Sequence, residues 1–393
     1  MNISAVSVLT ITASLVISTV ALANSTMFEQ FAYAVDNCDA SSICTNIPDS
    51  NSQTNSCTVS STCTNQESDF AFGNTQSNDC TNVGIPGCSN SASVLFGPES
   101  TDNIQSNDCT SVGDSACTNE IFDGSRNVQT NVCDSKALCA NSAIFDDNTQ
   151  NVACSAARNS QGCVNQAVGN SNNQNLECKD VGFRCGNLAF GNNNNQNLDC
   201  KDNEARFCDN FVSSGDRNNM DLRCKNASGD CTNFILDGSD NTEKLTCDTV
   251  GTNGCVNRVS GNDNIQNLNC SFVGDQGCIN DLINFQTFFG INGNNQNMNC
   301  IFVSLGCTNI AGADGNSQNL FCARMATSCT NEAGSPQTPT SSNTQSILCA
   351  HAGSCSNGGV NTNVVANGAS CQSNGPDTTT ICQPGRTIIR PNS

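Results

Sequence analysis

The sequence predicts an all-β protein whose chain winds into a two-walled parallel β-solenoid of about 15 rungs, each of 22–24 residues. Three observations predict this fold. The 30 cysteines fall into 15 consecutive pairs, Asn and Gln recur at fixed offsets around each pair, and polarity alternates with a period of two before each first cysteine. We therefore expect disulfide-stapled rungs whose interior carries Asn and Gln ladders.

Each repeat unit reads Asn-x-Gln-x-(Leu/Asn)-x-Cys, then a short variable stretch, then Cys-x-Asn, and residues 194–210 contain every part of it. The Asn six positions before the first cysteine is present in 13 of 15 units, and the Asn two positions after the second cysteine is present in 14. The Gln four positions before the first cysteine is present in 11 units. Such fixed offsets argue against disorder, although the polar composition alone would permit it.

The residues before each first cysteine predict a β-strand. Leu268, Gln266 and Asn264 occupy alternate positions before Cys270, and the residues between them are mostly polar in the other units as well. A period of two places the amide, apolar and cysteine residues on one face, which we take as the inward face. After the second cysteine the alternation resumes and predicts a second, shorter strand. Gly then precedes the next unit and predicts a turn.

Stacking explains why the inward residues are amides. In parallel in-register strands, equivalent Asn or Gln side chains lie about 4.8 Å apart and can hydrogen-bond along a column. The alternative, that Asn merely favours turns, would account for the outer loops but not for an Asn held at one offset. Representative ladder residues are Asn194, Gln196, Asn210, Asn264, Gln266 and Asn280.

The cysteines can pair within a rung or between rungs along a column. Each column would hold 15 members, so pairing along a column would leave one thiol in each column unpaired, whereas pairing within the rung leaves none. Consecutive pairing is therefore predicted. The pairs are Cys38 and Cys44, Cys57 and Cys63, Cys80 and Cys88, Cys109 and Cys117, Cys133 and Cys139, Cys154 and Cys163, Cys178 and Cys185, Cys200 and Cys208, Cys224 and Cys231, Cys247 and Cys255, Cys270 and Cys278, Cys300 and Cys307, Cys322 and Cys329, Cys349 and Cys355, and Cys371 and Cys382.

Residues 1–34 are predicted to be a secretory signal peptide, because residues 3–22 are apolar and uncharged and small residues precede both candidate cleavage points, after Ala23 and after Ala34. The alternative is a retained membrane anchor, since about 20 apolar residues can span a bilayer. Residues 35–382 form the repeat domain, and residues 383–393 form a C-terminal tail. We expect no membrane span in the mature chain.

Charge and cysteine content limit the classes of function. The formal net charge is -20, and the first 125 residues contain 13 acidic residues and no Lys or Arg. Phosphate backbones would repel such a chain, so nucleic acid is not an expected partner. So many disulfides require an oxidising compartment, which predicts an extracellular or cell-surface location. The single His351 and the absence of Cys-x-x-Cys predict neither an enzyme nor a cofactor or metal site.

Two kinds of surface site are candidates. Phe285, Phe288 and Phe289 lie in a long connection and could contact a partner, although the rings could equally fold back over their own rung. Asn226 and Asn269 stand in Asn-x-Ser/Thr sequons and are candidate glycosylation sites.

The Asn-x-Gln columns on a strand-turn-strand unit, visible in residues 191–196, resemble the curlin-type repeats of bacterial functional-amyloid fibres, here with a cysteine pair added to each repeat. The resemblance covers about 350 residues as a pattern. It implies a β-solenoid subunit and suggests that the chain forms fibres.

The expected function is that of a secreted structural repeat protein of the cell surface or an extracellular fibre, which self-associates head to tail through the open edges of its solenoid. The last unit has lost both Asn positions and is followed by Pro384 and Arg386, which could either blunt this edge or attract the acidic first quarter of another copy. The alternative function is a monomeric rod-like adhesin or ligand-binding surface protein. Other surface proteins or glycans are candidate partners.

Overall fold

The computed structural model of the chain consists of β-strands and turns, without a helix in the part that it describes. The predicted signal peptide lies outside the described residues, and side chains are described between 53 and 356. The described residues are 36–39, 43–46, 52–58, 62–68, 75–83, 87–93, 102–110, 116–122, 124–134, 138–155, 162–202, 207–251, 254–274, 277–282, 293–311, 315–324, 328–333, 344–350, 354–358, 362–367, 370–373, 378–383 and 387–389.

The described strands form a first sheet of seventeen strands and a second sheet of fifteen. The first sheet contains β1 (Asp36–Asp39), β3 (Ser52–Thr58), β5 (Thr75–Thr81), β7 (Ile104–Thr110), β9 (Val128–Asp134), β11 (Thr149–Ser155), β13 (Asn173–Lys179), β15 (Asn195–Lys201), β17 (Asn219–Lys225), β19 (Thr242–Asp248), β21 (Ile265–Ser271), β23 (Asn295–Ile301), β25 (Ser317–Ala323), β27 (Thr344–Ala350), β29 (Thr362–Asn367), β31 (Thr378–Gln383) and β32 (Thr387–Ile389). The second sheet contains β2 (Ile43–Asn46), β4 (Thr62–Ser68), β6 (Gly87–Ser93), β8 (Ala116–Ile121), β10 (Leu138–Ile144), β12 (Cys163–Val168), β14 (Arg184–Phe190), β16 (Phe207–Val212), β18 (Asp230–Ile235), β20 (Cys255–Val259), β22 (Cys278–Leu282), β24 (Cys307–Ala311), β26 (Ser328–Ala333), β28 (Ser354–Gly358) and β30 (Ser370–Ser373).

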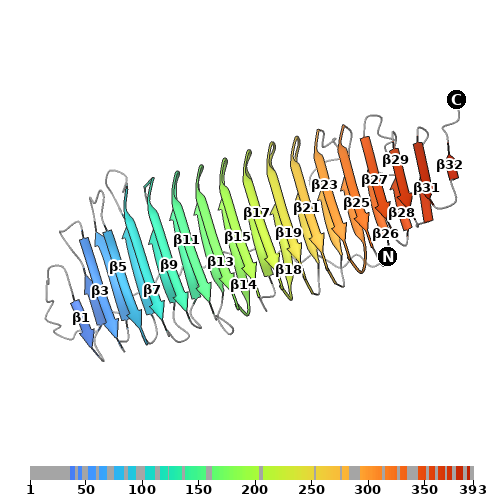
Figure 1. Cartoon of the computed structure of the whole chain (residues 1–393). Helices are drawn as coiled ribbons and strands as arrows, with labels where there is room; N and C mark the ends of the chain where they lie inside the picture. Colours follow the sequence, from blue (N-terminus) through green and yellow to red (C-terminus); the bar gives the residue numbers. More distant parts are fainter. Residues whose placement is uncertain are drawn as a thin grey trace, which may run out of the picture. The chain divides into compact units, whose positions relative to one another are not determined.

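From β1 to β30, each odd-numbered strand and the even-numbered strand after it form one rung, and successive rungs stack in sequence order with parallel strands (Figure 1). The register places equivalent residues over one another: Cys178 lies opposite Cys200, which lies opposite Cys224. The two-walled parallel β-solenoid predicted from the sequence is therefore confirmed, including its ladders and its disulfide-bonded rungs.

The face assignment is also confirmed. In β15 the buried and partly exposed residues alternate, so that Gln196, Leu198 and Cys200 are no more than 2% exposed while Asn197 points outward. All six representative ladder residues are buried: Asn194, Gln196, Asn210, Asn264, Gln266 and Asn280. The interior thus consists of columns of amides, sulfur and aliphatic side chains that run from rung to rung.

The Asn six positions before the first cysteine joins the rungs through the main chain. The main-chain N–H of Asn194 donates to Oδ1 of Asn218 (2.8 Å), whose own N–H donates to Oδ1 of Asn241 (2.8 Å). The sequence pattern predicted amide-to-amide bonds at this position, but not that the side chain satisfies the N–H at the start of the neighbouring strand. Asp has no side-chain N–H, and Gln is one methylene longer, so neither offers the acceptor and the donor of Asn at the same distance from the main chain. This difference accounts for the Asn at this position in 13 of 15 units.

Glycines stack where the chain turns into each new rung. Gly215, Gly238 and Gly261 have φ between 134° and 156°, and a Cβ on Gly261 would lie 1.8 Å from the carbonyl oxygen of Gly238. Side chains are excluded here both by the backbone conformation and by the close approach of the neighbouring rung. The turn predicted from these glycines is present.

The last unit differs from its predicted frame. Cys371 lies in β30 opposite Cys355, in the second sheet, and Cys382 lies in β31 opposite Ala366, in the first sheet. Cys382 therefore begins a further rung, and Ala366 occupies the first-cysteine position of the rung that ends with β30. The Asn six positions before Cys371 and the Asn two positions after Cys382 are both absent. The repeat pattern therefore could not show which strand of a rung each cysteine belongs to. The side chains of Cys38, Cys44, Cys371 and Cys382 lie outside the described residues, and their pairing stays a prediction.

The predicted C-terminal tail contains one strand. β32 pairs with β31 in antiparallel orientation, with Thr380 opposite Ile389. The first sheet therefore ends on a short antiparallel strand, whereas β30 is the last described strand of the second sheet.

We predict that Asn210→Leu lowers the free energy of unfolding by about 1–3 kcal/mol, because it leaves buried hydrogen-bonding groups without partners. Asn210 accepts a hydrogen bond from Asn187 (3.0 Å) and donates to Asn233 (3.1 Å) and to the carbonyl oxygen of Asp221 (3.2 Å). The measurement is guanidinium unfolding with the disulfides intact. Asn197→Leu, an outward change in the same rung, is the control and should cost much less. Equal losses would contradict the role of the buried ladder.

Candidate functional site

The disulfides form a buried column along the interior. Thirteen consecutive cysteine pairs, from Cys57–Cys63 to Cys349–Cys355, are disulfides, with Cα atoms 6.4–6.7 Å apart. This is the pairing within rungs that the sequence predicted. Every one of these cysteines belongs to the main apolar cluster, so the bridges themselves occupy the core.

Sulfur atoms of neighbouring rungs also lie close together. One sulfur each from Cys200, Cys208 and Cys224, for example, lie within 4.8 Å of one another. Three converging cysteines can bind a metal ion only as thiolates. Because Cys200 is bonded to Cys208 and Cys224 to Cys231, these sulfurs are disulfide sulfurs and serve to link the two walls.

We predict that replacing one bridge, with Cys200→Ser and Cys208→Ser together, lowers the free energy of unfolding by roughly 2–3 kcal/mol, the value for a short closed loop. The double replacement leaves no free thiol that could exchange with the neighbouring bridges. Thermal unfolding of the oxidised protein measures the effect. A loss near zero would show that the stacked strands hold the two walls together without the bridge.

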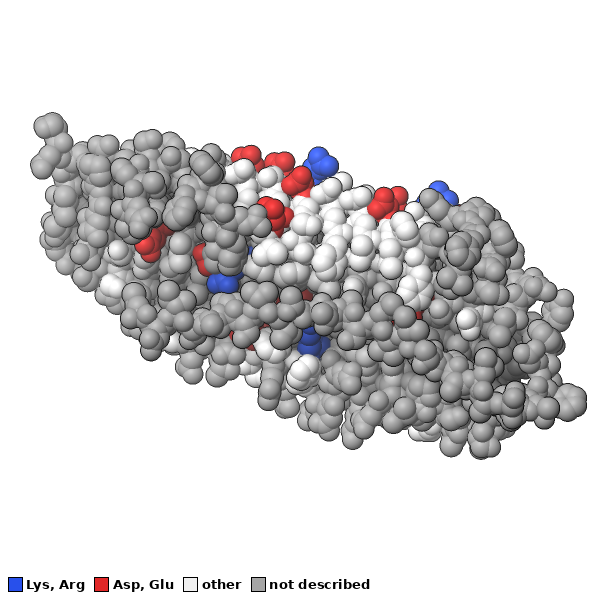
Figure 2. Space-filling view, turned by 180° about the vertical axis from the view of Figure 1, so that it is seen from behind, with Lys and Arg blue, Asp and Glu red and all other residues white. Residues whose placement is uncertain are grey.

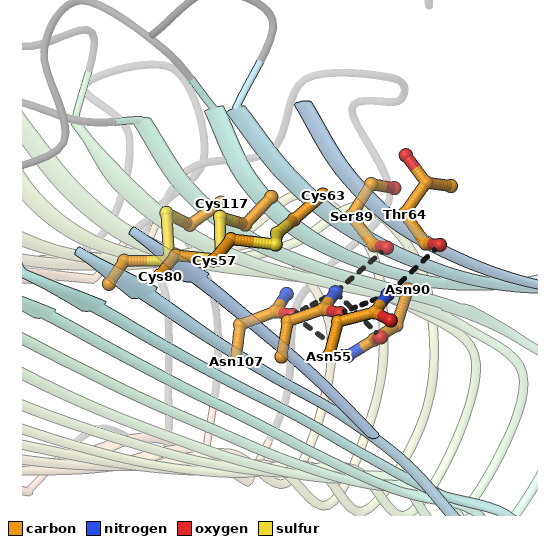
Figure 3. Close-up of a disulfide and its surroundings, with 12 residues drawn as sticks. Asn55, Cys57, Cys63, Thr64, Cys80, Ser89, Asn90, Asn107 and Cys117 are labelled. Atoms are coloured by element: carbon orange, nitrogen blue, oxygen red, sulfur yellow. Dashed lines mark hydrogen bonds between the residues drawn. A yellow bond between two sulfur atoms is a disulfide. The ribbon is translucent and has the colours of Figure 1, made fainter. Parts of the chain in front are cut away.

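In the first rungs a network of asparagines crosses between the two walls (Figure 3). Asn55 donates to Asn65 of the opposite wall (2.7 Å), Asn65 donates to Asn78 (2.9 Å), and Asn78 donates to Asn90 (2.9 Å). From β11 to β27, an apolar residue (Val, Leu, Met or Ile) replaces the first-sheet asparagine two positions before the cysteine. The second-sheet Asn keeps its bond to a main-chain carbonyl of the first sheet, as from Asn65 to Ser77 (3.0 Å) and from Asn187 to Asn197 (2.9 Å). The core therefore changes from polar to aliphatic along the stack.

The glutamine column is directional. Each Gln donates Nε2 to Oε1 of the Gln in the preceding rung, as Gln174 does to Gln150 (3.0 Å) and Gln196 does to Gln174 (2.9 Å). The second N–H reaches a main-chain carbonyl of the opposite wall, such as that of Phe211 (3.2 Å from Gln196). Both donors of the amide are satisfied in this way, and the buried column links the walls as well as the rungs.

Met220 and Glu243 interrupt this column. Met220 lies opposite Gln196 in β17, and Glu243 lies opposite Met220 in β19. Met220 has no N–H to donate, and Oε1 of Gln196 has no hydrogen-bond partner among the described residues. The column resumes at Gln266, which donates to Oε2 of Glu243 (2.8 Å). The sequence already marked these two rungs, since they are among the units without Gln at this position.

Glu243 is a fully buried carboxyl, and burial raises its pKa to about 8, although the bond from Gln266 acts in the opposite direction. Its Oε1 has no partner in the described part of the chain. In the rung of Gln196, the main-chain carbonyl of Phe211 accepts the second hydrogen bond of the glutamine. In the rung of Glu243, the main-chain carbonyl of Arg258 holds the equivalent register position. A protonated carboxyl has one O–H donor, so the neutral form of Glu243 can replace the amide of a Gln at this position.

We predict that the free energy of unfolding falls as the pH rises from about 4.5, the ordinary carboxyl pKa, toward about 8. Glu243→Gln should remove this part of the pH dependence of stability. The folded chain holds the Glu243 proton over this range while the unfolded chain releases it, so alkali favours unfolding. Guanidinium unfolding at pH 5 and pH 8.5 measures the effect. The variant should be the more stable protein at pH 8.5 and close to the wild type at pH 5. Identical pH dependence in both proteins would contradict it.

The candidate surface residues are placed as follows. Asn226 is exposed in a turn and donates to Asp202 (2.8 Å), and Asn269 is exposed on β21 and accepts from Asn299 (3.2 Å). Both side chains are on the surface, and glycosylation of either stays a prediction. Phe285, Phe288 and Phe289 lie outside the described residues.

An exposed aromatic cluster was missed in the sequence. Phe272 and Phe302 stack with ring centroids 4.9 Å apart, and the Arg324 guanidinium lies 5.1 Å from the centroid of Phe302. All three have φ near +55°, a backbone conformation that bulky side chains rarely adopt. They stand two positions after successive first cysteines, and this shared offset is the signal that could have found them.

Comparison with models of protein families, with curated proteins and with solved structures finds no match to this chain. Within the described residues, the structure contains no helix of the length and apolarity needed to cross a membrane.

Proposed function

We propose that the protein is a secreted structural protein of the cell surface or of an extracellular fibre, and that its copies associate end to end. The observation that carries the proposal is the continuous parallel stacking of two sheets in one register, with a disulfide in thirteen described rungs. Such a stack has strand edges at both ends, and a second copy can continue it.

Secretion is supported by redox chemistry and by the signal-peptide pattern. The reducing cytosol would not maintain these bridges, whereas an extracellular compartment would. Cleavage after Ala34 would make Val35 the new N-terminus, one residue before β1, at the edge of the stack. The curlin-type pattern of the repeats supports a fibre subunit in particular.

The two sheets offer different edges for end-to-end contact. In the second sheet, β30 of one copy can pair in parallel with β2 of the next, which would continue the existing register. In the first sheet, the antiparallel β32 would have to move aside before β1 could pair with β31. A heterologous contact of this kind does not close on itself and therefore propagates as a filament.

Charge opposes association of copies side by side. Acidic residues lie along the upper edge of the described surface in Figure 2, interspersed with fewer Lys and Arg residues. Among the exposed turn residues are Asp216, Asp237 and Asp240. Like charges on the long faces of two copies repel each other, which favours contact through the ends.

The second candidate function is a monomeric rod-like adhesin or ligand-binding surface protein. The antiparallel β32 favours it, because a short antiparallel end strand blocks parallel continuation of the first sheet. We propose no catalytic role for either candidate.

We predict that the mature protein forms filaments at low salt, and that truncation after Gln383 increases filament length, because it removes β32 and leaves the parallel edge of β31 open. Light scattering and negative-stain electron microscopy measure both effects. Arg386→Ser with Arg390→Ser, in the full-length chain, is the control that separates loss of charge from loss of the strand. A mature chain that stays monomeric at high concentration and low salt, with or without β32, would contradict end-to-end association.

A further inference from the structure

The outward face of the first sheet is hollowed along the stack. One groove of about 400 Å³ lies over β9 to β17, and a second of about 570 Å³ lies over β19 to β27. The strands that line them run side by side in Figure 1.

The same two columns of outward residues line both grooves: those three positions and those one position before the first cysteine. β17 and β19 are hydrogen-bonded neighbours, with Asp221 opposite Lys244 and Arg223 opposite Thr246. The two grooves therefore lie end to end along ten strands, roughly 43 Å at about 4.8 Å per strand, and together they are called the trough. This length suits an extended chain rather than a small molecule.

The floor of the trough carries amides at regular intervals. Asn197 donates to Asn175 (2.9 Å) and Asn175 donates to Asn151 (2.9 Å). In the second groove, Asn319 donates to Asn297 (3.1 Å) and Asn297 to Asn267 (3.0 Å). These bonds use one N–H and one lone pair of a carboxamide within the column, which leaves a second donor and a second acceptor for a ligand. Fixed amides that repeat over three successive rungs in each groove match a polymer of hydroxyl-bearing units.

The remaining lining residues define the charge and the apolar contacts. Glu177 and Asp199 are exposed in the first groove, and Arg223 and the Asp221–Lys244 ion pair lie where the two grooves meet. Val132 at one end of the trough and Phe321 and Leu348 at the other are 43%, 37% and 45% exposed. Carboxylates accept hydrogen bonds from hydroxyls and repel anionic polymers, and the apolar side chains can pack against the C–H faces of sugar rings.

We propose that this trough binds a neutral, extended polysaccharide along the axis of the solenoid. A peptide strand would pair with the edge of a sheet, whereas the trough lies on a face whose main-chain groups are already paired. The same face of a second copy is also hollowed, so two such faces could not pack closely. The acidic side chains disfavour a polyanion. The inference goes beyond the proposed structural role, and it does not depend on end-to-end association.

The test is a sedimentation assay of the mature, oxidised protein with microcrystalline cellulose and with chitin. The wild type should be retained, and Asn175→Ala with Asn197→Ala should weaken retention about tenfold, the effect of losing one or two hydrogen bonds. Asn173→Ala with Asn195→Ala is the matched control, because these amides form an equivalent outward ladder on the same two strands, outside the trough. The control should bind like the wild type.

Phe321→Ala with Leu348→Ala provides a second, independent variant at the other end of the trough, and circular dichroism with a free-thiol assay establishes that each variant is folded and oxidised. Weakened binding by both trough variants, with an unaffected control, supports the proposal. Absence of retention on both polysaccharides would overturn it. So would equal loss in the control, or a preference for polygalacturonate or for an unfolded peptide.

Discussion

The structure depends on the register of its buried amides. A carboxamide in the interior must find its partners in the rungs before and after it, as Gln174 does between Gln150 and Gln196. A slip of one residue between two strands would turn this whole face outward and leave the column unsatisfied. Each Asn and Gln column therefore enforces the register, the strand spacing and the parallel direction together. The positions of the outward residues follow from these.

The disulfides complement the amides because they act across the stack rather than along it. Each joins a first-sheet strand to the second-sheet strand of its own rung, where the walls approach to a Cα separation near 6.5 Å. Sulfur thereby replaces the large apolar side chains that this composition lacks. Since the bond closes within one rung, the loop between its cysteines can vary in length without displacing either strand.

Much of this fold was predictable because one signal was repeated many times. The alternation of residues 264–270 alone fixed the strand, its inward face and its ladder residues. Two features were not predictable in the same way. The strands that hold Cys371 and Cys382 could not be assigned, because the asparagines that mark the other units are absent there. The bond between the Asn194 main chain and the Asn218 side chain is visible only in three dimensions. The outward residues that line the trough stand at fixed offsets from the first cysteine, but the hollow along them is visible only in three dimensions.

The interruption of the stack affects both faces of the same two strands. In β17 and β19, Met220 and Glu243 replace the inward glutamines, while their chain neighbours Asp221 and Lys244 replace the outward asparagines and form an ion pair of 3.0 Å. An exposed ion pair contributes little stability, but it specifies which residues face each other. Where the Gln column is interrupted, the Asn columns continue, as from Asn218 to Asn241, and opposite charges at the surface add to the register that they maintain. The buried Glu243 retains its proton, so that no unpaired charge enters the interior. These rungs thus have an ion pair on the outward face and a neutral carboxyl on the inward face.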